Sequence, residues 1–322
     1  MNNYSFLEKI LHRLVLSSKS IKNYTYELEL ALFKKHLINH EDNHVFVAGL
    51  ARSGTTILMN MIFKSKQFAS LTYEDMPFLM APNFWNKIQP NSKHESLKER
   101  AHNDGILIST NSPEAFEEVF WRSFKADISE KQFKEYIHLI LNKNKKHRYV
   151  SKNNQNVKRL KIIRKIFPNS LVLIPFRSPL QQSNSLIKQH KKFIEMQQED
   201  GFVKDYMNWI FHTEFGLTYK PIISDSLEYK DTHSINHWLE QWLKVYSKLY
   251  EELSEDENII FICYEELCLN KKYWEKIKEK LKISHLYEAE FSISNSKVEY
   301  EFDNELKDSC DRFYEELLHK VV

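Results

Sequence analysis

The segment from His44 to Phe63 constrains the fold more than any other part of the sequence. It begins with an apolar run, residues 44–48, whose β-branched and aromatic residues are typical of a buried strand. A turn from Gly49 to Gly54 follows, and then apolar residues recur at helical spacing. The whole chain has five glycines, and two of them lie in this turn. The segment therefore predicts a buried strand, a tight turn and a helix.

A strand that leads through a glycine-containing turn into a helix predicts an anion site. Backbone N–H groups in the first turn of a helix have no acceptor within the helix, and the helix dipole favours negative charge there. Ser53, Thr55 and Thr56 would add hydroxyl donors, and Arg52 would add a charged fork of N–H groups. The alternative without a ligand site is an ordinary strand–turn–helix unit with a surface arginine.

The spacing from Gly49 to Gly54 also matches the first part of the phosphate-binding loop G-x-x-x-x-G-K-[ST]. The residue after Gly54 is Thr55, so the lysine that reaches the β- and γ-phosphates in that motif is missing. A nucleotide kinase therefore remains an alternative interpretation, and so does a non-catalytic nucleotide-binding protein of the same fold.

Composition sets wider limits. With 322 residues, 42% of them hydrophobic, the chain is long enough for one large α/β domain. The net charge of +2 gives no field that favours nucleic acid, and no apolar run is long enough to span a membrane. Cys263, Cys268 and Cys310 show no metal-ligand spacing. The N-terminus does not resemble a signal peptide, so we expect a cytoplasmic protein with reduced thiols.

Apolar strand candidates alternate with helical patterns along most of the chain. The expected strands are residues 44–48, 68–73, 147–151, 170–176 and 258–264. This alternation predicts an α/β fold with an open, mostly parallel sheet and helices on both faces. We expect one domain, 1–322, built from N-terminal helices, a nucleotide-binding core and helical segments on the acceptor side. These parts are residues 1–43 (N-terminal helices), 44–190 and 258–300 (core), and 83–130 and 191–257 (acceptor side).

Four charged residues lie just beyond expected strand ends: Arg52, Glu74, Lys152 and Arg177. Parallel sheets bind ligands outside the carboxyl ends of their strands. We therefore expect these four side chains to face one site.

Two local patterns give further expectations. Ser112, Pro113 and Glu114 are typical of a helix start, so Glu117 and Glu118 are expected on a solvated helix face. Pro175 lies inside an apolar strand, which predicts that the strand is at an edge or that its ladder ends there.

The motif Ala51-Arg-Ser-Gly-Thr-Thr56 resembles the 5′-phosphosulfate loop of sulfotransferases that use 3′-phosphoadenosine-5′-phosphosulfate (PAPS), apart from Ala51, where proline is usual. Arg177 and Ser185, eight residues apart, resemble the 3′-phosphate site of that family. The segments from Ser151 and from Cys263 also resemble it, especially its bacterial members and the tyrosylprotein and carbohydrate sulfotransferases, although Asn154 stands where proline is common. The resemblance covers residues 44–80 and 147–270.

The resemblance implies that a sulfuryl group moves from PAPS to a hydroxyl or amine of a carbohydrate, lipid or small metabolite. It implies that the PAPS phosphates are held without a metal. The residues implied to bind PAPS are Arg52, Ser53, Gly54, Thr55, Thr56, Arg177 and Ser185.

The resemblance also implies a catalytic role for Lys152 and Arg52 in stabilising the leaving group. It places the proton acceptor at Glu74 first, at Asp75 next, and at His102 if the cytosolic type is followed. The acceptor pocket is expected in segments 83–125 and 191–250. Their aromatic and histidine residues are either pocket or core: Trp85, Trp121, Tyr206, Trp209 and His212.

Overall fold

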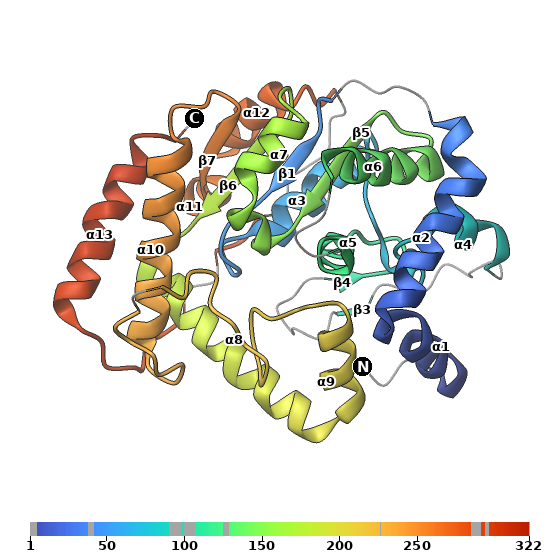
Figure 1. Cartoon of the computed structure of the whole chain (residues 1–322). Coiled ribbons are helices and arrows are strands. Elements are labelled where there is room, and N and C mark those ends of the chain that lie inside the picture. The colour runs from blue at the N-terminus through green and yellow to red at the C-terminus, as the bar shows by residue number, and fades with distance from the viewer. Residues whose placement is uncertain are drawn as a thin grey trace.

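The computed structural model describes residues 5–37, 42–89, 98–99, 107–124, 129–225, 227–284, 291–293 and 296–321. Within these residues, five strands form a parallel sheet in the order β2-β5-β1-β6-β7 (Figure 1). The strands are β1 (Val45–Val47), β2 (Phe68–Ala69), β5 (Arg148–Lys152), β6 (Leu171–Phe176) and β7 (Ile259–Cys263). A separate antiparallel pair consists of β3 (Lys98–Glu99) and β4 (Leu107–Ile108). The expected α/β class with an open parallel sheet is confirmed.

Helices connect the strands and surround the sheet. The α-helices before β5 are α1 (Phe6–Ser17), α2 (Lys19–Phe33), α3 (Thr55–Lys64), α4 (Pro82–Ile88), α5 (Glu117–Phe124) and α6 (Glu130–Asn144). Those that follow are α7 (Leu160–Ile166), α8 (Pro179–Glu199), α9 (Gly201–Trp209), α10 (Ile235–Leu253), α11 (Tyr264–Leu269), α12 (Lys271–Lys280) and α13 (Asn304–Leu318). Short 3₁₀ helices are η1 (Lys34–His36), η2 (Tyr73–Asp75) and η4 (Asn154–Lys158).

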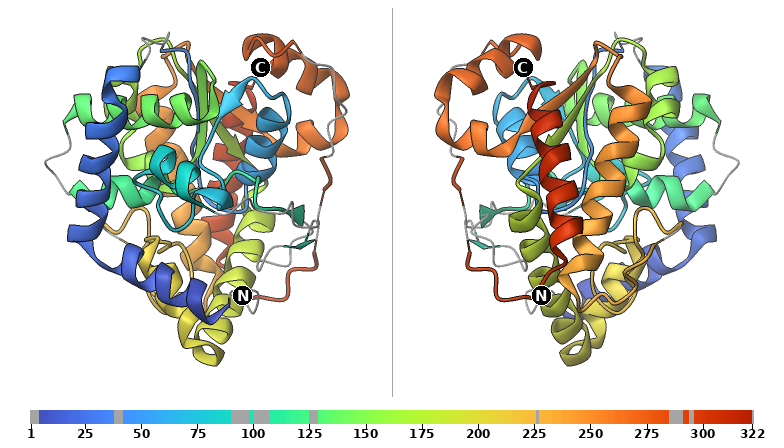
Figure 2. Two further views of the ribbon diagram at one scale, coloured as in Figure 1. Left: turned by 90° about the vertical axis from the view of Figure 1, so that its right-hand side faces the viewer. Right: turned by 90° about the vertical axis from the view of Figure 1, so that its left-hand side faces the viewer.

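Alternation along each strand builds two cores, one on each face of the sheet. Phe46, Val172 and Phe261 point into a core shared with α6, α7, α10 and α13. Val47 and Leu173 point to the opposite face, where α3 and α12 cover them. The two groups of helices lie on opposite sides of the sheet in Figure 2. Burial on both faces explains why the strands have continuous apolar runs instead of alternating polarity.

Pro175 does not mark a sheet edge. Strand β6 lies between β1 and β7, and Pro175 pairs with Ile262. The amide of Val172 donates to the carbonyl of Asn258 in the β7 direction, so the nitrogen at position 175 faces the β1 side. Strand β1 has already ended there, because its pairing with β6 stops at Leu173. The missing N–H of Pro175 therefore removes no ladder hydrogen bond. The alternative that the ladder ends there holds on the β1 side, and the alternative of an edge strand was wrong.

Helix α5 begins at Glu117, four residues later than the sequence pattern indicates. The hydroxyl of Ser112 instead accepts a hydrogen bond from the amide of Ser109 within a turn, and Pro113 forms a bridge with Thr72. Glu117 and Glu118 are buried rather than solvated, with exposed fractions of 1% and 3%. The expectation of a solvated face was wrong, because Glu118 forms ion pairs with arginines and Glu117 receives hydrogen bonds from Trp121, Tyr149 and Asn156.

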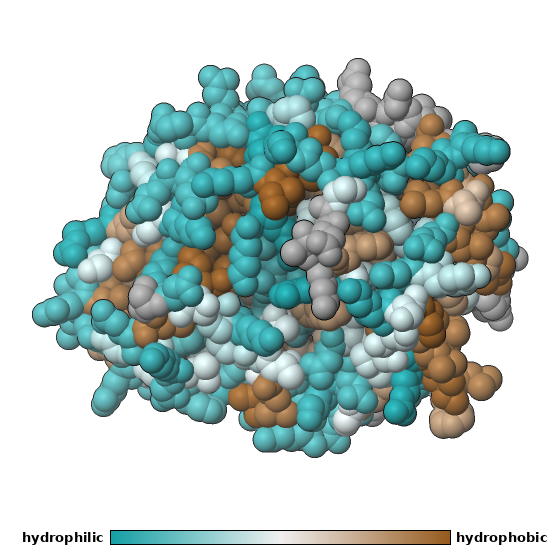
Figure 3. All heavy atoms as spheres, in the orientation of Figure 1, coloured by the Kyte–Doolittle hydropathy of each residue, from teal (hydrophilic) through white to brown (hydrophobic). Residues whose placement is uncertain are grey.

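The face of the molecule seen in Figure 3 is largely hydrophilic, with some exposed apolar atoms over α1. The exposed apolar side chains of this helix are Phe6, Leu7, Ile10 and Leu14. Across the part of the chain that the structure describes, no helix combines the length and apolar character that a membrane span requires.

Candidate functional site

The candidate site lies at the carboxyl edge of the parallel sheet, where four strands end. Val47 at the end of β1 pairs with Lys152 at the end of β5, and Phe176 at the end of β6 pairs with Cys263 at the end of β7. The turn after β1 and Arg177 after β6 therefore start from neighbouring positions on one edge. This brings together the segments that the sequence separates by more than a hundred residues.

Gly54 shapes the turn at the start of α3. It is the N-cap residue of this helix with φ 91°, a left-handed conformation that favours glycine. A Cβ atom at this position would lie 2.3 Å from the ring of Tyr264, which packs directly over the turn. Thr55 and Thr56 form the buried first turn of α3, where the helix leaves amide groups without helical acceptors. Glycine is thus required here both for its backbone conformation and for the close approach of Tyr264.

The protein itself holds the turn in shape. The Ser53 hydroxyl donates to the carbonyl of Leu50 over 2.8 Å, and the Gln182 amide donates to the carbonyl of Ala51 over 2.9 Å. Ser53 is fully buried, so its hydroxyl serves the loop in this structure. Arg52 adopts φ 68°, a strained conformation for a residue with a side chain, and these bonds hold it there.

Arg52 connects the loop to helix α8. Its Nε donates a hydrogen bond to the Ser185 hydroxyl over 3.0 Å. Ser185 is half-buried on the second turn of α8, whose first residue, Pro179, follows the end of β6 closely. Arg52 and Ser185, which the family resemblance predicts at opposite ends of one nucleotide, therefore lie in direct contact.

Arg177 is buried at the start of the β6–α8 turn, with an exposed fraction of 6%. Burial lowers the pKa of its guanidinium, and the nearby Glu265 carboxylate, 3.8 Å from Nε, opposes this shift. Glu265 also accepts a hydrogen bond from the amide of Ser178 over 3.0 Å, so it fixes both the turn and the arginine. A buried guanidinium attracts an anion strongly, because little water screens the interaction.

Lys152 lies at the end of β5 and is almost fully buried. The next residue, Asn153, donates through its side chain to Glu118 over 2.9 Å. Glu118 also receives two hydrogen bonds from Arg159, at 2.7 and 2.9 Å. Burial on its own raises the pKa of Glu118, but the bonds and charge of Arg159, with Asn153 and Arg122, outweigh burial and lower it. This carboxylate is thus ionised and anchors the segment that carries Lys152.

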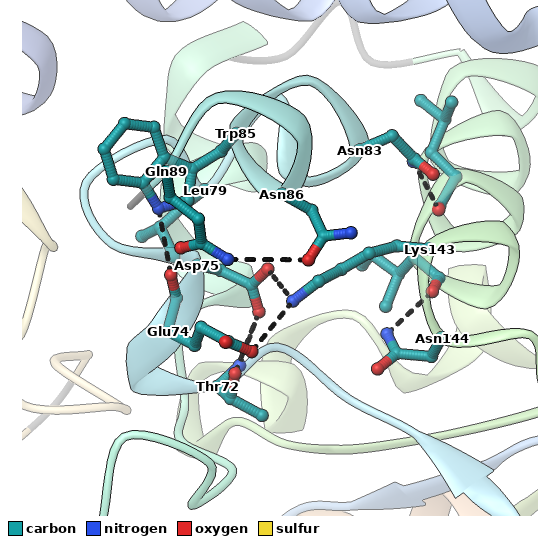
Figure 4. A network of polar contacts seen from close by, with 12 residues as sticks. Thr72, Glu74, Asp75, Leu79, Asn83, Trp85, Asn86, Gln89, Lys143 and Asn144 are labelled. Atoms are coloured by element: carbon teal, nitrogen blue, oxygen red, sulfur yellow. Dashed lines mark hydrogen bonds and ion pairs between the residues drawn. The ribbon is translucent and has the colours of Figure 1, made fainter. Parts of the chain in front are cut away.

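Glu74 and Asp75 point toward Lys143 of α6 but lie in different environments (Figure 4). Asp75 is 1% exposed, and its carboxylate lies 2.7 Å from Lys143 Nζ and accepts from the amide of Thr72 over 2.8 Å. Burial raises the pKa of Asp75, while Lys143 and Thr72 oppose the rise. Glu74 lies farther from Lys143, at 3.7 Å, and a quarter of its side chain is exposed. Glu74 is therefore the more accessible of the two carboxylates. Asp75 is buried and connects the η2 segment to α6 through Lys143.

A pocket that is partly open to solvent lies beside the strand end that carries Lys152. Tyr206 and His212 line this pocket. The indole N–H of Trp85 instead donates to the backbone carbonyl of Glu74, and that of Trp121 donates to the carboxylate of Glu117. Trp209 packs at the edge of the core, against Phe202. His102 lies outside the described residues.

Sequence reasoning missed several residues at this edge. Glu114 lines the pocket with Lys152 and accepts a hydrogen bond from the Tyr73 hydroxyl over 3.0 Å. Glu118 anchors the segment of Lys152, Glu265 holds Arg177, and Tyr264 packs on Gly54. Of these three supporting residues, Tyr264 and Glu265 could have been found from the sequence, because they follow the end of an expected strand.

Comparison with known proteins gives a family match and more distant structural similarities. The profile of the sulfotransferase family matches residues 44–214, more than half of the 322-residue chain. Sulfotransferase STF1 from Mycobacterium tuberculosis is similar at 11% identity and a TM-score of 0.48, covering 96% of this chain and 81% of its own. The sulfotransferase domain from the curacin biosynthetic pathway is similar at 14% identity and a TM-score of 0.42, covering 84% and 97%. No curated protein sequence matches the chain. On the family match, this protein belongs to the sulfotransferase family.

Proposed function

We propose that the protein transfers the sulfuryl group of PAPS to a hydroxyl or amine of an acceptor. The hydrogen bond between Arg52 and Ser185 is the observation that carries this proposal. It joins the loop proposed for the 5′-phosphosulfate to the helix proposed for the 3′-phosphate, and Arg177 begins the same turn. A nucleotide with anionic groups at both ends fits such a paired arrangement better than one with a single phosphate chain.

The residues present fit the donor nucleotide in charge and in shape. The close packing of Tyr264 over Gly54 leaves the first turn of α3 with backbone amides rather than a side chain at the loop surface. Thr55, Thr56 and Arg52, with the backbone of Ser53 and Gly54, are proposed to hold the 5′ end, and Arg177 and Ser185 the 3′-phosphate. PAPS supplies an activated sulfuryl group on a good leaving group, so the protein has to bind, orient and neutralise charge.

The proposed roles follow from the positions of the cations. Buried Lys152 and half-buried Arg52 are proposed to stabilise negative charge on the phosphate that leaves, because preorganised cations act strongly there. Glu74 is proposed to take the proton of the acceptor, since Asp75 is buried and held by Lys143. His102 is a further candidate from the sequence.

A P-loop kinase is the alternative from a different class. Thr55 stands where such an enzyme has its phosphate-binding lysine. The two functions differ in their need for Mg²⁺ and for a 3′-phosphate, so one experiment distinguishes them.

The test is calorimetric titration with adenosine 3′,5′-bisphosphate, with and without EDTA, beside AMP and Mg·ATP. We expect binding that is independent of metal and that AMP does not reproduce. Binding of Mg·ATP alone would favour the kinase, and absence of binding by every nucleotide would favour a non-catalytic protein of this fold.

A further inference from the structure

The backbone of Glu74 is fixed on both sides by other parts of the chain. Its amide donates to the carbonyl of Thr110 over 2.8 Å, and its carbonyl accepts from the indole N–H of Trp85 over 3.0 Å. Trp85 belongs to α4, and Thr110 belongs to the turn after β4. The direction in which the Glu74 side chain leaves the backbone is therefore set before any ligand binds.

Lys143 of α6 lies beside the Glu74 carboxylate (Figure 4). Its side chain is 7% exposed, and its Nζ lies 2.7 Å from Asp75 Oδ1 and 3.7 Å from Glu74 Oε2. The other oxygen of Asp75 accepts from the amide of Thr72 over 2.8 Å. Both Asp75 oxygens thus face groups that can only donate, an ammonium and a backbone amide, as suits an ionised carboxylate. Asp75 anchors the ammonium group, which in turn lies next to the more accessible carboxylate of Glu74.

The end of α6 that carries Lys143 is tied to α4. Asn142 donates through its side chain to Asn83 Oδ1 over 3.1 Å, and the Asn83 side chain donates to a backbone carbonyl of α6 over 2.8 Å. Asn83 lies in the first turn of α4, two residues before Trp85. The helix that holds the Glu74 backbone and the helix that holds its side chain are therefore linked to each other.

The charges of this group allow Glu74 to become neutral. An ammonium group that is buried without a counter-charge is costly. Because Asp75 lies closer to Lys143 than Glu74 does, the ammonium keeps an ion-pair partner when Glu74 takes a proton. In an isolated buried pair of one lysine and one glutamate, protonation of the glutamate would leave the lysine without a counter-charge. The adjacent aspartate makes orientation by a lysine compatible with proton uptake.

We propose that Lys143 is a positioning residue that orients Glu74 for proton transfer, with Asp75 as its permanent counter-charge. This inference rests on the proposed function, in which Glu74 takes the acceptor proton. In that step the acceptor O–H or N–H bond breaks and its proton passes to the Glu74 carboxylate. A bond forms from the acceptor atom to sulfur, and the bond from sulfur to the 5′-phosphate oxygen breaks. Its electron pair leaves with adenosine 3′,5′-bisphosphate, and Lys143 keeps its own proton throughout.

Unfolding of the full chain in urea tests the contact between Lys143 and Glu74 without any acceptor. Lys143→Met, Glu74→Gln and the double variant form a double-mutant cycle. We expect coupling of about threefold or more in the unfolding equilibrium constant, as for a partly exposed ion pair. Lys143→Met leaves Asp75 buried without a counter-charge, so the cycle is repeated in an Asp75→Asn background, where that cost is absent. No coupling in either background would overturn the inference.

Release of sulfate from PAPS, with water as the acceptor, tests the effect on transfer. Lys143→Met should lower the rate at saturating PAPS by at least about tenfold and leave the affinity for adenosine 3′,5′-bisphosphate unchanged. In the Glu74→Gln background the same substitution should change the rate by less than about twofold, because Lys143 acts through that carboxylate. Lys143→Arg should recover most of the rate, since a guanidinium can pair with both carboxylates.

Lys134→Met is the matched control, because Lys134 lies on the same helix and forms an ion pair with Asp42 at the same distance of 2.7 Å. It should change neither the rate nor the affinity for the bisphosphate. Equal losses of rate from Lys143→Met with and without Glu74 would overturn the inference while leaving the donor site intact. Failure of the wild-type protein to bind the bisphosphate would instead contradict the proposed function, so the two failures are distinguishable.

Discussion

The Nε of Arg52 donates a hydrogen bond to the Ser185 hydroxyl over 3.0 Å, across a separation of 133 residues. The contact joins the turn after β1 to helix α8, which follows the adjacent strand β6. A ligand that binds one of these residues therefore affects the other, and the two proposed ends of the nucleotide site are one structural unit.

Arg177→Ala should weaken binding of adenosine 3′,5′-bisphosphate by about 10- to 100-fold, since hydrogen bonds to charged groups contribute about 1.5–3 kcal/mol. Binding of AMP should change little, because AMP has no 3′-phosphate. Calorimetric titration of both nucleotides measures the difference. Arg164→Ala is the matched control. Arg164 also has a carboxylate partner, Asp256, but it donates to the carbonyl of Ser170, just before the start of β6 and not at its carboxyl end. Equal losses for both nucleotides would remove Arg177 from the 3′-phosphate role.

Gly54→Ala should abolish tight nucleotide binding. Alanine at φ 91° costs about 1 kcal/mol or more, and its Cβ would also meet the Tyr264 ring at 2.3 Å. Gly201→Ala is the control, because a Cβ there meets no atom within 4 Å. Titration of the folded variants with adenosine 3′,5′-bisphosphate provides the measurement. Wild-type affinity in Gly54→Ala would mean that the loop does not contact the nucleotide.

Glu74→Gln should leave nucleotide binding intact while turnover falls by at least about a hundredfold, the size expected for a lost general base. Asp75→Asn should chiefly lower the free energy of unfolding, because it breaks a buried ion pair with Lys143. Single-turnover transfer of labelled sulfate and denaturant unfolding measure the two effects. Glu114→Gln serves as the comparison, since Glu114 lines the pocket. If Glu114→Gln stops turnover and Glu74→Gln does not, the proton acceptor is Glu114.

Glu118→Gln should lower the free energy of unfolding by about 3 kcal/mol at neutral pH, because it leaves Arg159 partly unpaired in the interior. The folded protein holds the pKa of Glu118 below its ordinary value of 4.5. Its stabilising contribution is therefore fully present above pH 4.5 and is lost as the pH falls through the folded-state pKa. Urea unfolding between pH 3 and 7 should show the two proteins converging at the acid end. The exposed Glu130→Gln should cost under about 1 kcal/mol throughout. A gap that is constant with pH would contradict this account of Glu118.

The sequence was a good guide to the sheet and to the residues at its carboxyl edge. In an α/β chain, short continuous apolar runs indicate central parallel strands, because a parallel strand that is buried on both faces has to be apolar throughout. Arg52, Lys152 and Arg177 could be assigned to one edge for the same reason, since parallel strands bring their ends together. The roles of these residues in binding and catalysis remain predictions.

The burial of Glu117 and Glu118 could not be predicted from the sequence. Glu118 looks like an acidic residue in the first turn of a solvated helix, and its partner Arg159 is 41 residues away. A buried ion pair has no local periodicity, so only the folded chain reveals it. The choice between the two alternatives for Pro175 could not be made from sequence for a similar reason, because it depends on where the neighbouring strand β1 ends.

The internal bonds of the β1–α3 turn have a kinetic consequence. Gln182 and Ser53 fix the carbonyls of Ala51 and Leu50 before any nucleotide arrives. The turn therefore needs no ordering step when it receives an anion, and its entropy has already been lost during folding. Nucleotide capture should be a one-step encounter whose observed rate rises linearly with concentration, without the plateau that a slow loop closure would impose.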